Sequence, residues 1–264
     1  MSWLAIHLDF ELRLVESPDA ARAVGEILVR PCFAALSRMS GRRKDRWSRH
    51  GKPSAEAIAG YLGDASLDSV ALETKRGQEI VASAEVENGI RERGPSVPAE
   101  TRHPARIAIP YVAAELEAVV GGVCDLARTI RATAGYVALE PKYGWAHEVS
   151  LGGSRPRERV GLSEQRFRER RGRGWYEERL VTALASVEWG TFLGSGHLAR
   201  LDPGEVRASG AFARVVELAA GQLAYLQVSE DPADDLTEGF EAKLQAARRA
   251  LAPVLMDVSG ISLE

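Results

Sequence analysis

The chain is poor in cysteine, in long apolar runs and in excess charge of either sign. Two widely separated cysteines in 264 residues supply neither a disulfide framework nor metal-ligand spacing. No apolar stretch reaches the roughly 18–20 residues that a membrane-spanning helix needs. The 34 basic and 37 acidic residues nearly cancel, which excludes a dominant nucleic-acid footprint. The first residues lack a basic segment ahead of an apolar one, so we expect no signal peptide and a cytoplasmic protein.

What is present is typical of a globular protein with a sizeable core, because 45% of the residues are hydrophobic and 27% are charged. Apolar and polar residues alternate strictly from Leu4 to Leu14, which predicts a strand with one buried and one solvated face. Period-two patterns and turn residues predict two hairpins, and apolar residues at helical spacing predict three helices. The hairpins would turn at Arg76-Gly77 and Ala220-Gly221, and the helices would start at Pro18, run from Pro110 to Thr133, and cover 240–251.

Strands and helices come in blocks rather than in strict alternation, which predicts an α+β fold. We expect a single domain, residues 1–264, with a largely antiparallel sheet packed on one face by helices. A weak boundary would fall at 91–104, a stretch that contains Gly94 and three prolines. Residues 40–55 are predicted to form a loop.

Gly194-Ser195-Gly196 follows a predicted strand and enters a predicted helix, the context in which bare backbone can approach a pyrophosphate. Glu217 lies 21 positions beyond Gly196, at the spacing of a ribose-binding acid. Pro203-Gly204 cuts the crossover short, and the preceding strand carries Glu188 where a buried parallel strand would be apolar. A plain strand-to-helix turn is therefore favoured, and a nucleotide-binding enzyme is kept as an alternative.

No arrangement of residues predicts a catalytic or metal site. His7, Asp9, Glu11 and Arg13 share one strand face, which reads as a solvated face with alternating charges. His147-Glu148 is not followed by a second histidine at zinc-protease spacing, and no serine stands in a nucleophile elbow. We expect no catalytic residues, no metal and no cofactor, and hence no enzyme.

Charged clusters stand out in three segments. Basic residues surround Trp47 over 42–52, and eight arginines occur over 155–173, just before Trp175 and Tyr176. Basic residues interleaved with aromatics can hold a nucleic-acid backbone, so a nucleic-acid-binding protein remains a second alternative. Solvated surface loops are favoured, however, because the whole chain is nearly neutral. Residues 230–241 form the opposite case, with six carboxylates and no base, a surface suited to a cationic partner.

The last third of the sequence resembles a known family. The segment Ser186-Val187-Glu188-Trp189-Gly190-Thr191-Phe192-Leu193-Gly194, followed by His197-Leu198-Ala199-Arg200-Leu201, is similar to the tryptophan-centred strand and short helix of the type VI immunity family. The later hairpin that ends in 223–228, the acidic 232–235 loop and the final helix follow the same order. Two departures are Gly190, where family members carry a bulky apolar residue, and Ala233, where they carry glycine.

The resemblance implies a non-enzymatic inhibitor that binds one cognate polymorphic toxin, in many cases a nuclease, in the cytoplasm of the producing cell. A nuclease surface that binds phosphates is basic, so an acidic loop could both steer toward it and cover it. We therefore predict a toxin-contact surface on this loop, with two aromatic anchors, and assign Trp189 to the core. The predicted contact residues are Asp231, Asp234, Asp235, Glu238, Trp175 and Tyr176.

Overall fold

The computed structural model describes residues 2–33, 35–43, 46–77, 79–88, 103–140 and 182–257. The chain divides into two compact units, Met1–Gly135 and Tyr136–Glu264. The division falls inside a strand and not at 91–104, most of which lies outside the described residues. The expectation of one domain over 1–264 stays a prediction.

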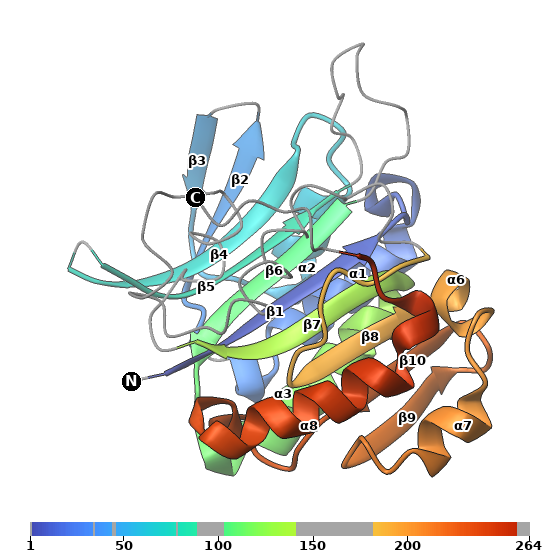
Figure 1. Cartoon of the computed structure of the whole chain (residues 1–264). Coiled ribbons are helices and arrows are strands. Elements are labelled where there is room, and N and C mark those ends of the chain that lie inside the picture. Colours follow the sequence, from blue (N-terminus) through green and yellow to red (C-terminus); the bar gives the residue numbers. More distant parts are fainter. Residues whose placement is uncertain are drawn as a thin grey trace. The chain divides into compact units, whose positions relative to one another are not determined.

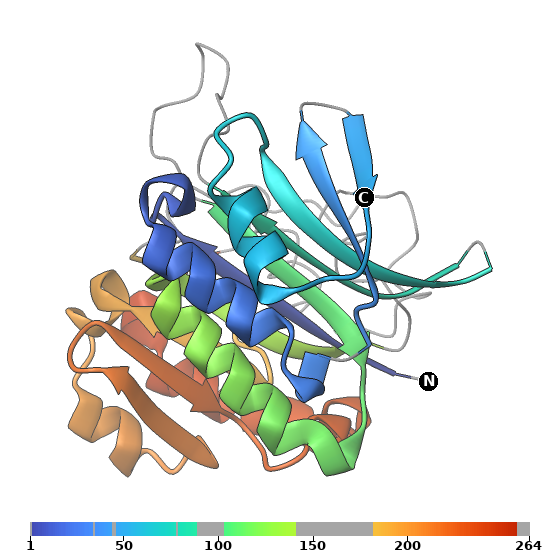
Figure 2. The same ribbon diagram turned by 180° about the vertical axis from the view of Figure 1, so that it is seen from behind.

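The first unit is an antiparallel sheet with helices on one face (Figure 1; Figure 2). Hydrogen-bonded neighbours follow the order β3-β2-β4-β5-β6-β1, and each of these pairings is antiparallel. Figure 2 shows α1, α2 and α3 on the same side of these strands. The elements are β1 (Trp3–Phe10), α1 (Pro18–Leu28), β2 (Arg38–Arg43), β3 (Arg46–His50), α2 (Ala55–Leu62), β4 (Ser69–Arg76), β5 (Glu79–Glu87), β6 (His103–Pro110), α3 (Leu116–Thr129) and the beginning of β7 (Ala132–Glu140).

The alternation of β1 sets which side of this sheet is buried. Leu4, Ile6, Leu8 and Phe10 are at most 2% exposed, and the residues between them are half-buried. The helices bury the apolar face, because α1 and α3 direct most of their apolar residues inward. This confirms the predicted α+β class and the antiparallel sheet with helices on one face.

The second unit contains the rest of β7, then β8 (Gly190–Gly194), α6 (Ser195–Leu198), α7 (Pro203–Ala208), β9 (Arg214–Ala219), β10 (Leu223–Gln227) and α8 (Glu238–Ala250). Its strand order is β7-β8-β10-β9, and β10 pairs antiparallel with both β8 and β9. Every residue of β8 and β10 is buried. The β9–β10 hairpin turns at Gly221 with φ of +63°, as the sequence predicts.

Three predictions about local structure were wrong. The segment 40–55 contains the β2–β3 hairpin instead of a loop. The predicted helix from Pro110 begins at Leu116, because the chain up to Pro110 forms β6 against β1. The strand predicted to reach Leu14 ends at Phe10, and Leu14 begins a short 3-10 turn.

Candidate functional site

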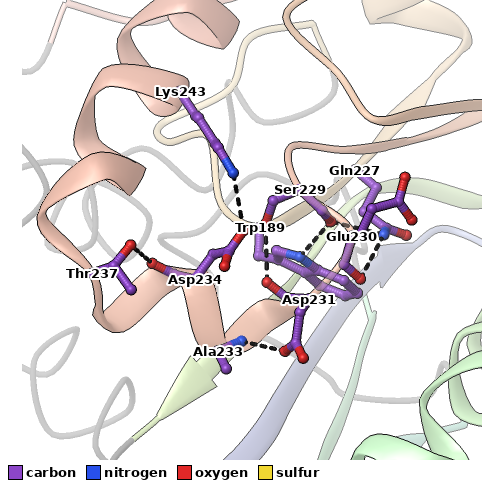
Figure 3. Close-up of polar contacts among 9 residues, drawn as sticks. All are labelled: Trp189, Gln227, Ser229, Glu230, Asp231, Ala233, Asp234, Thr237 and Lys243. Carbon is purple, nitrogen blue, oxygen red and sulfur yellow. Dashed lines mark hydrogen bonds and ion pairs between the residues drawn. The ribbon is translucent and has the colours of Figure 1, made fainter.

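The acidic segment predicted to contact a partner lies in the second unit, between the end of β10 and the start of α8. It begins at Ser229 and passes through a 3-10 turn, η6 (Pro232–Leu236), whose N-cap is Asp231. Figure 3 shows this segment beside the indole of Trp189. We call residues 229–237 the acidic loop.

Trp189 lies in the core, as the sequence predicts, and from there it supports the acidic loop. The residue is fully buried, and its indole Nε1 donates a hydrogen bond of 2.9 Å to the carbonyl oxygen of Ser229. The backbone N–H of Val228 donates back to the carbonyl of Trp189 at 2.8 Å. A buried indole N–H needs an acceptor, and here that acceptor is the first residue of the loop.

Gln227 makes a second buried connection to the same loop. Its side chain is 1% exposed, and Nε2 donates to the carbonyl oxygens of Ser229 at 2.8 Å and Glu230 at 3.4 Å. The amide oxygen lies 3.4 Å from the hydroxyl of Tyr225. Two buried side-chain donors, from Trp189 and Gln227, therefore converge on the Ser229 carbonyl and hold the entry to the loop (Figure 3).

Two of the predicted carboxylates also order the loop. A side-chain oxygen of Asp231 accepts from the N–H of Ala233 at 2.7 Å, which caps η6. Asp234 pairs with Lys243 of α8 at 2.9 Å. The hydrogen bond from Lys243 lowers the pKa of the Asp234 carboxyl below its ordinary value, so Asp234 stays ionised at a lower pH than an ordinary aspartate.

The structure places only some of the predicted contact residues. Asp231 and Asp234 are half-buried and belong to one short loop. The side chains of Asp235 and Glu238 lie outside the described residues, as do Trp175, Tyr176 and the arginine-rich segment 155–173. Nothing in the structure therefore tests whether the six predicted residues form one surface.

Sequence reasoning missed the residues that hold the loop in place. Gln227 is the last residue of an apolar strand, where a polar side chain is ordinarily exposed. Lys243 occurs in a helix with many charged residues. Glu230, which is exposed, precedes the predicted contact residues on the same loop. The available signal was a polar residue at the end of a uniformly apolar run, where burial requires a hydrogen-bond partner.

The structure gives a reason for the glycine at position 190. A Cβ atom built at this position would lie 2.7 Å from the hydroxyl oxygen of Tyr225 and 3.1 Å from the Cβ of Val137. The Tyr225 ring, whose centroid is 4.9 Å from that of Phe192, thus occupies the space of a larger side chain. The glycine and the tyrosine that binds Gln227 are a matched pair.

The segment Gly194-Ser195-Gly196 lacks the setting of a dinucleotide site. Within 182–257, β8 pairs antiparallel with β10, whereas the fingerprint requires a parallel strand-helix-strand unit. The helix that follows, α6, has four residues. The strand-to-helix turn favoured by the sequence is what the structure shows.

Of the basic segment 42–52, the described part forms the β2–β3 hairpin. Arg43 and Arg46 are exposed, and Arg42 pairs with Glu85 at 3.3 Å. Over the described ranges, no group of three or more His, Cys, Asp or Glu side chains is placed to hold a metal ion. None of the described helices combines the length and the apolar character needed to cross a membrane.

The fold is similar to that of the Pseudomonas aeruginosa T6SS protein PA0821, where T6SS denotes the type VI secretion system. The two structures superimpose with a TM-score of 0.61 over 97% of this chain and 73% of the other, at 13% sequence identity. At this identity the similarity concerns the fold. No protein-family model and no curated protein matches the chain.

Proposed function

We propose that this chain is an immunity protein that binds a cognate secreted bacterial toxin and covers its active surface without chemical turnover. The observation that carries the proposal is the similarity in fold, over almost the whole chain, to a protein of a type VI secretion system. That system delivers toxins between neighbouring bacteria, so a producing cell needs an inhibitor in its own cytoplasm. The resemblance of the segment around Trp189 and of the acidic loop to the type VI immunity family supports the same proposal.

The acidic loop has the physical properties of an inhibitory contact. Trp189 and Gln227 fix its entry from the core, and Asp231 and Asp234 fix its turn. A loop that is already ordered loses little conformational entropy on binding, which favours the slow dissociation that immunity requires. Its carboxylates would attract the basic surface of a phosphate-binding nuclease.

The proposed contact residues are those predicted from the sequence, Asp231, Asp234, Asp235 and Glu238, with Glu230 added because it is exposed on the same loop. Trp175 and Tyr176 remain proposed aromatic anchors. The nuclease class of the toxin is part of the proposal.

The first experiment is affinity purification of the tagged protein from its host, with co-purifying proteins identified by mass spectrometry. We expect one stoichiometric partner that kills or arrests cells when expressed alone and is neutralised by co-expression of this chain. No partner, or a partner without toxicity, would overturn the proposal. Nucleic acid in the eluate would instead support the alternative based on the arginine-rich segments.

The role of the acidic loop is tested with the variant Glu230→Gln/Asp234→Asn, which removes two charges while keeping the side-chain shapes. Removing long-range attraction should slow association several-fold at low salt, with a smaller effect at high salt. The matched control is Glu205→Gln/Glu217→Gln, which removes two exposed carboxylates elsewhere in the same unit. Equal association rates for the two variants would exclude the loop as the steering surface.

A further inference from the structure

Arg106 differs from every other arginine that is not exposed in the described part of the chain. Arg30 lies 2.5 Å from a carboxylate oxygen of Asp125, Arg42 lies 3.3 Å from Glu85, and Arg248 lies 2.8 Å from Glu241. Arg106 is half-buried in the middle of β6, and within the described ranges its guanidinium makes no hydrogen bond and no ion pair. A partly desolvated guanidinium without a carboxylate is costly to keep.

The register of the sheet explains why no internal carboxylate reaches Arg106. Its cross-strand neighbours are Glu85 on β5 and His7 on β1. Glu85 binds away from it, accepting from Ser69 Oγ at 2.9 Å and pairing with Arg42. His7 pairs with Asp9 on its own strand at 3.0 Å. Both flanking groups are therefore committed to other partners.

Arg106 also belongs to the face of the first unit's sheet opposite the three helices. Residues that alternate with the buried positions of β1, β5 and β6 form this face. Directly beside the Arg106 row, the register aligns Ala5, Ala108 and Ser83 across three strands. These side chains are short and project little from the sheet. The guanidinium therefore has room on this side for a group from another molecule.

We propose that Arg106 is an anchor residue that binds an acidic side chain of a protein partner docked on this face. A guanidinium fork binds a carboxylate in a bidentate manner, and arginines of this kind are enriched among residues that dominate interface energies. The occupant is a single carboxylate of a protein, because one unpaired guanidinium complements one negative charge. Asp9 and Glu85, paired with His7 and Arg42, leave no further positive charge beside it, among the described residues, for a polyphosphate chain. That the partner is the toxin rests on the proposed function, whereas the carboxylate-binding role of Arg106 does not.

The test compares Arg106→Gln and Arg106→Lys with the control Arg38→Gln, which alters an exposed arginine on β2. With the co-purified partner we expect Arg106→Gln to weaken binding at least about tenfold and the lysine variant to fall between it and the wild type. Thermal unfolding near that of the wild type would show that the variants fold. Wild-type affinity in Arg106→Gln would overturn the proposal.

A second measurement needs no toxin. The Nε–Hε nuclear magnetic resonance signal of Arg106, assigned from its disappearance in Arg106→Lys, is followed while N-acetylglutamate amide is added, with N-acetylglutamine amide as the neutral control. A saturable shift with the carboxylate alone supports the site even if the chain proves not to be an immunity protein. If neither compound shifts the signal, and purification finds no toxin partner, the anchor role is excluded.

Discussion

Strands β1 and β10 use polar side chains in different ways. In β1 the polar residues stand on the face away from the helices, and every second residue is buried. In β10 all five residues are buried, so the amide of Gln227 must find its partners inside the protein. It finds them in the Ser229 and Glu230 carbonyls. Polarity in β1 therefore follows exposure, whereas polarity at the end of β10 fixes a loop.

The largest effect that tests this comparison is expected at Trp189, which lies beneath the acidic loop. Trp189→Ala should destabilise the fold by about 3–5 kcal/mol, because it removes a fully buried indole and leaves a cavity. Trp189→Phe keeps most of the packing but removes the donor to Ser229 O, so a loss of about 1–3 kcal/mol is expected. Urea unfolding measures both, and wild-type stability in Trp189→Phe would mean that the hydrogen bond to Ser229 contributes nothing to the fold.

Gln227→Leu should cost about 1–3 kcal/mol, although leucine is the more apolar residue. The substitution removes the hydrogen bonds of the Gln227 side chain to the Ser229 and Glu230 carbonyls and to the Tyr225 hydroxyl. The matched control is Gln222→Leu in the exposed β9–β10 turn, where a change within about 0.5 kcal/mol is expected. Hydrogen exchange of residues 229–234 should rise in the first variant alone. A stabilised Gln227→Leu would contradict the role assigned to this side chain.

The same contrast explains what the sequence could predict. Strict alternation of apolar and polar residues was enough to predict β1. Turn glycines located both hairpins, since Gly77 and Gly221 have φ of +65° and +63°. The acidic loop was found from its charge alone. These features are local, and local pattern is what one sequence displays.

The missed features depend on contacts between distant segments. The arginine-rich β2–β3 hairpin lacks an apolar pattern, and the tight fit at Gly41 comes from the Tyr61 ring, 2.6 Å from where a Cβ would lie. β6 follows a proline-rich segment and is a strand because β1 and β5 pair with it. Likewise, the role of Gln227 depends on its burial and the role of Arg106 on the register of β6. Neighbouring residues in the sequence specify neither.

A smaller effect is expected from Asp125, which ties α3 to the end of α1 through Arg30. The hydrogen bond from Arg30 holds the pKa of the Asp125 carboxyl below its ordinary value of 3.8. The ion pair therefore stabilises the fold above that pH, and its contribution is lost as the pH falls through the lowered pKa. Because both side chains are more than one third exposed, the gain is under about 1 kcal/mol. Asp125→Asn should lose this amount at pH 7 and nothing at the acid end, as measured by urea unfolding.

The smallest effect is expected on the polar face of β1. His7→Gln should change the free energy of unfolding by no more than about 0.5 kcal/mol, because the side chain is 22% exposed and leaves no cavity when replaced. The neighbouring substitution Leu8→Ala, at a residue that is 0% exposed, should cost about 2–5 kcal/mol. Such a difference between adjacent residues is the signature of a strand with one buried face. Comparable losses at both positions would show that the polar face is held as tightly as β10, and that a ligand approaching Arg106 would have to displace other parts of the protein first.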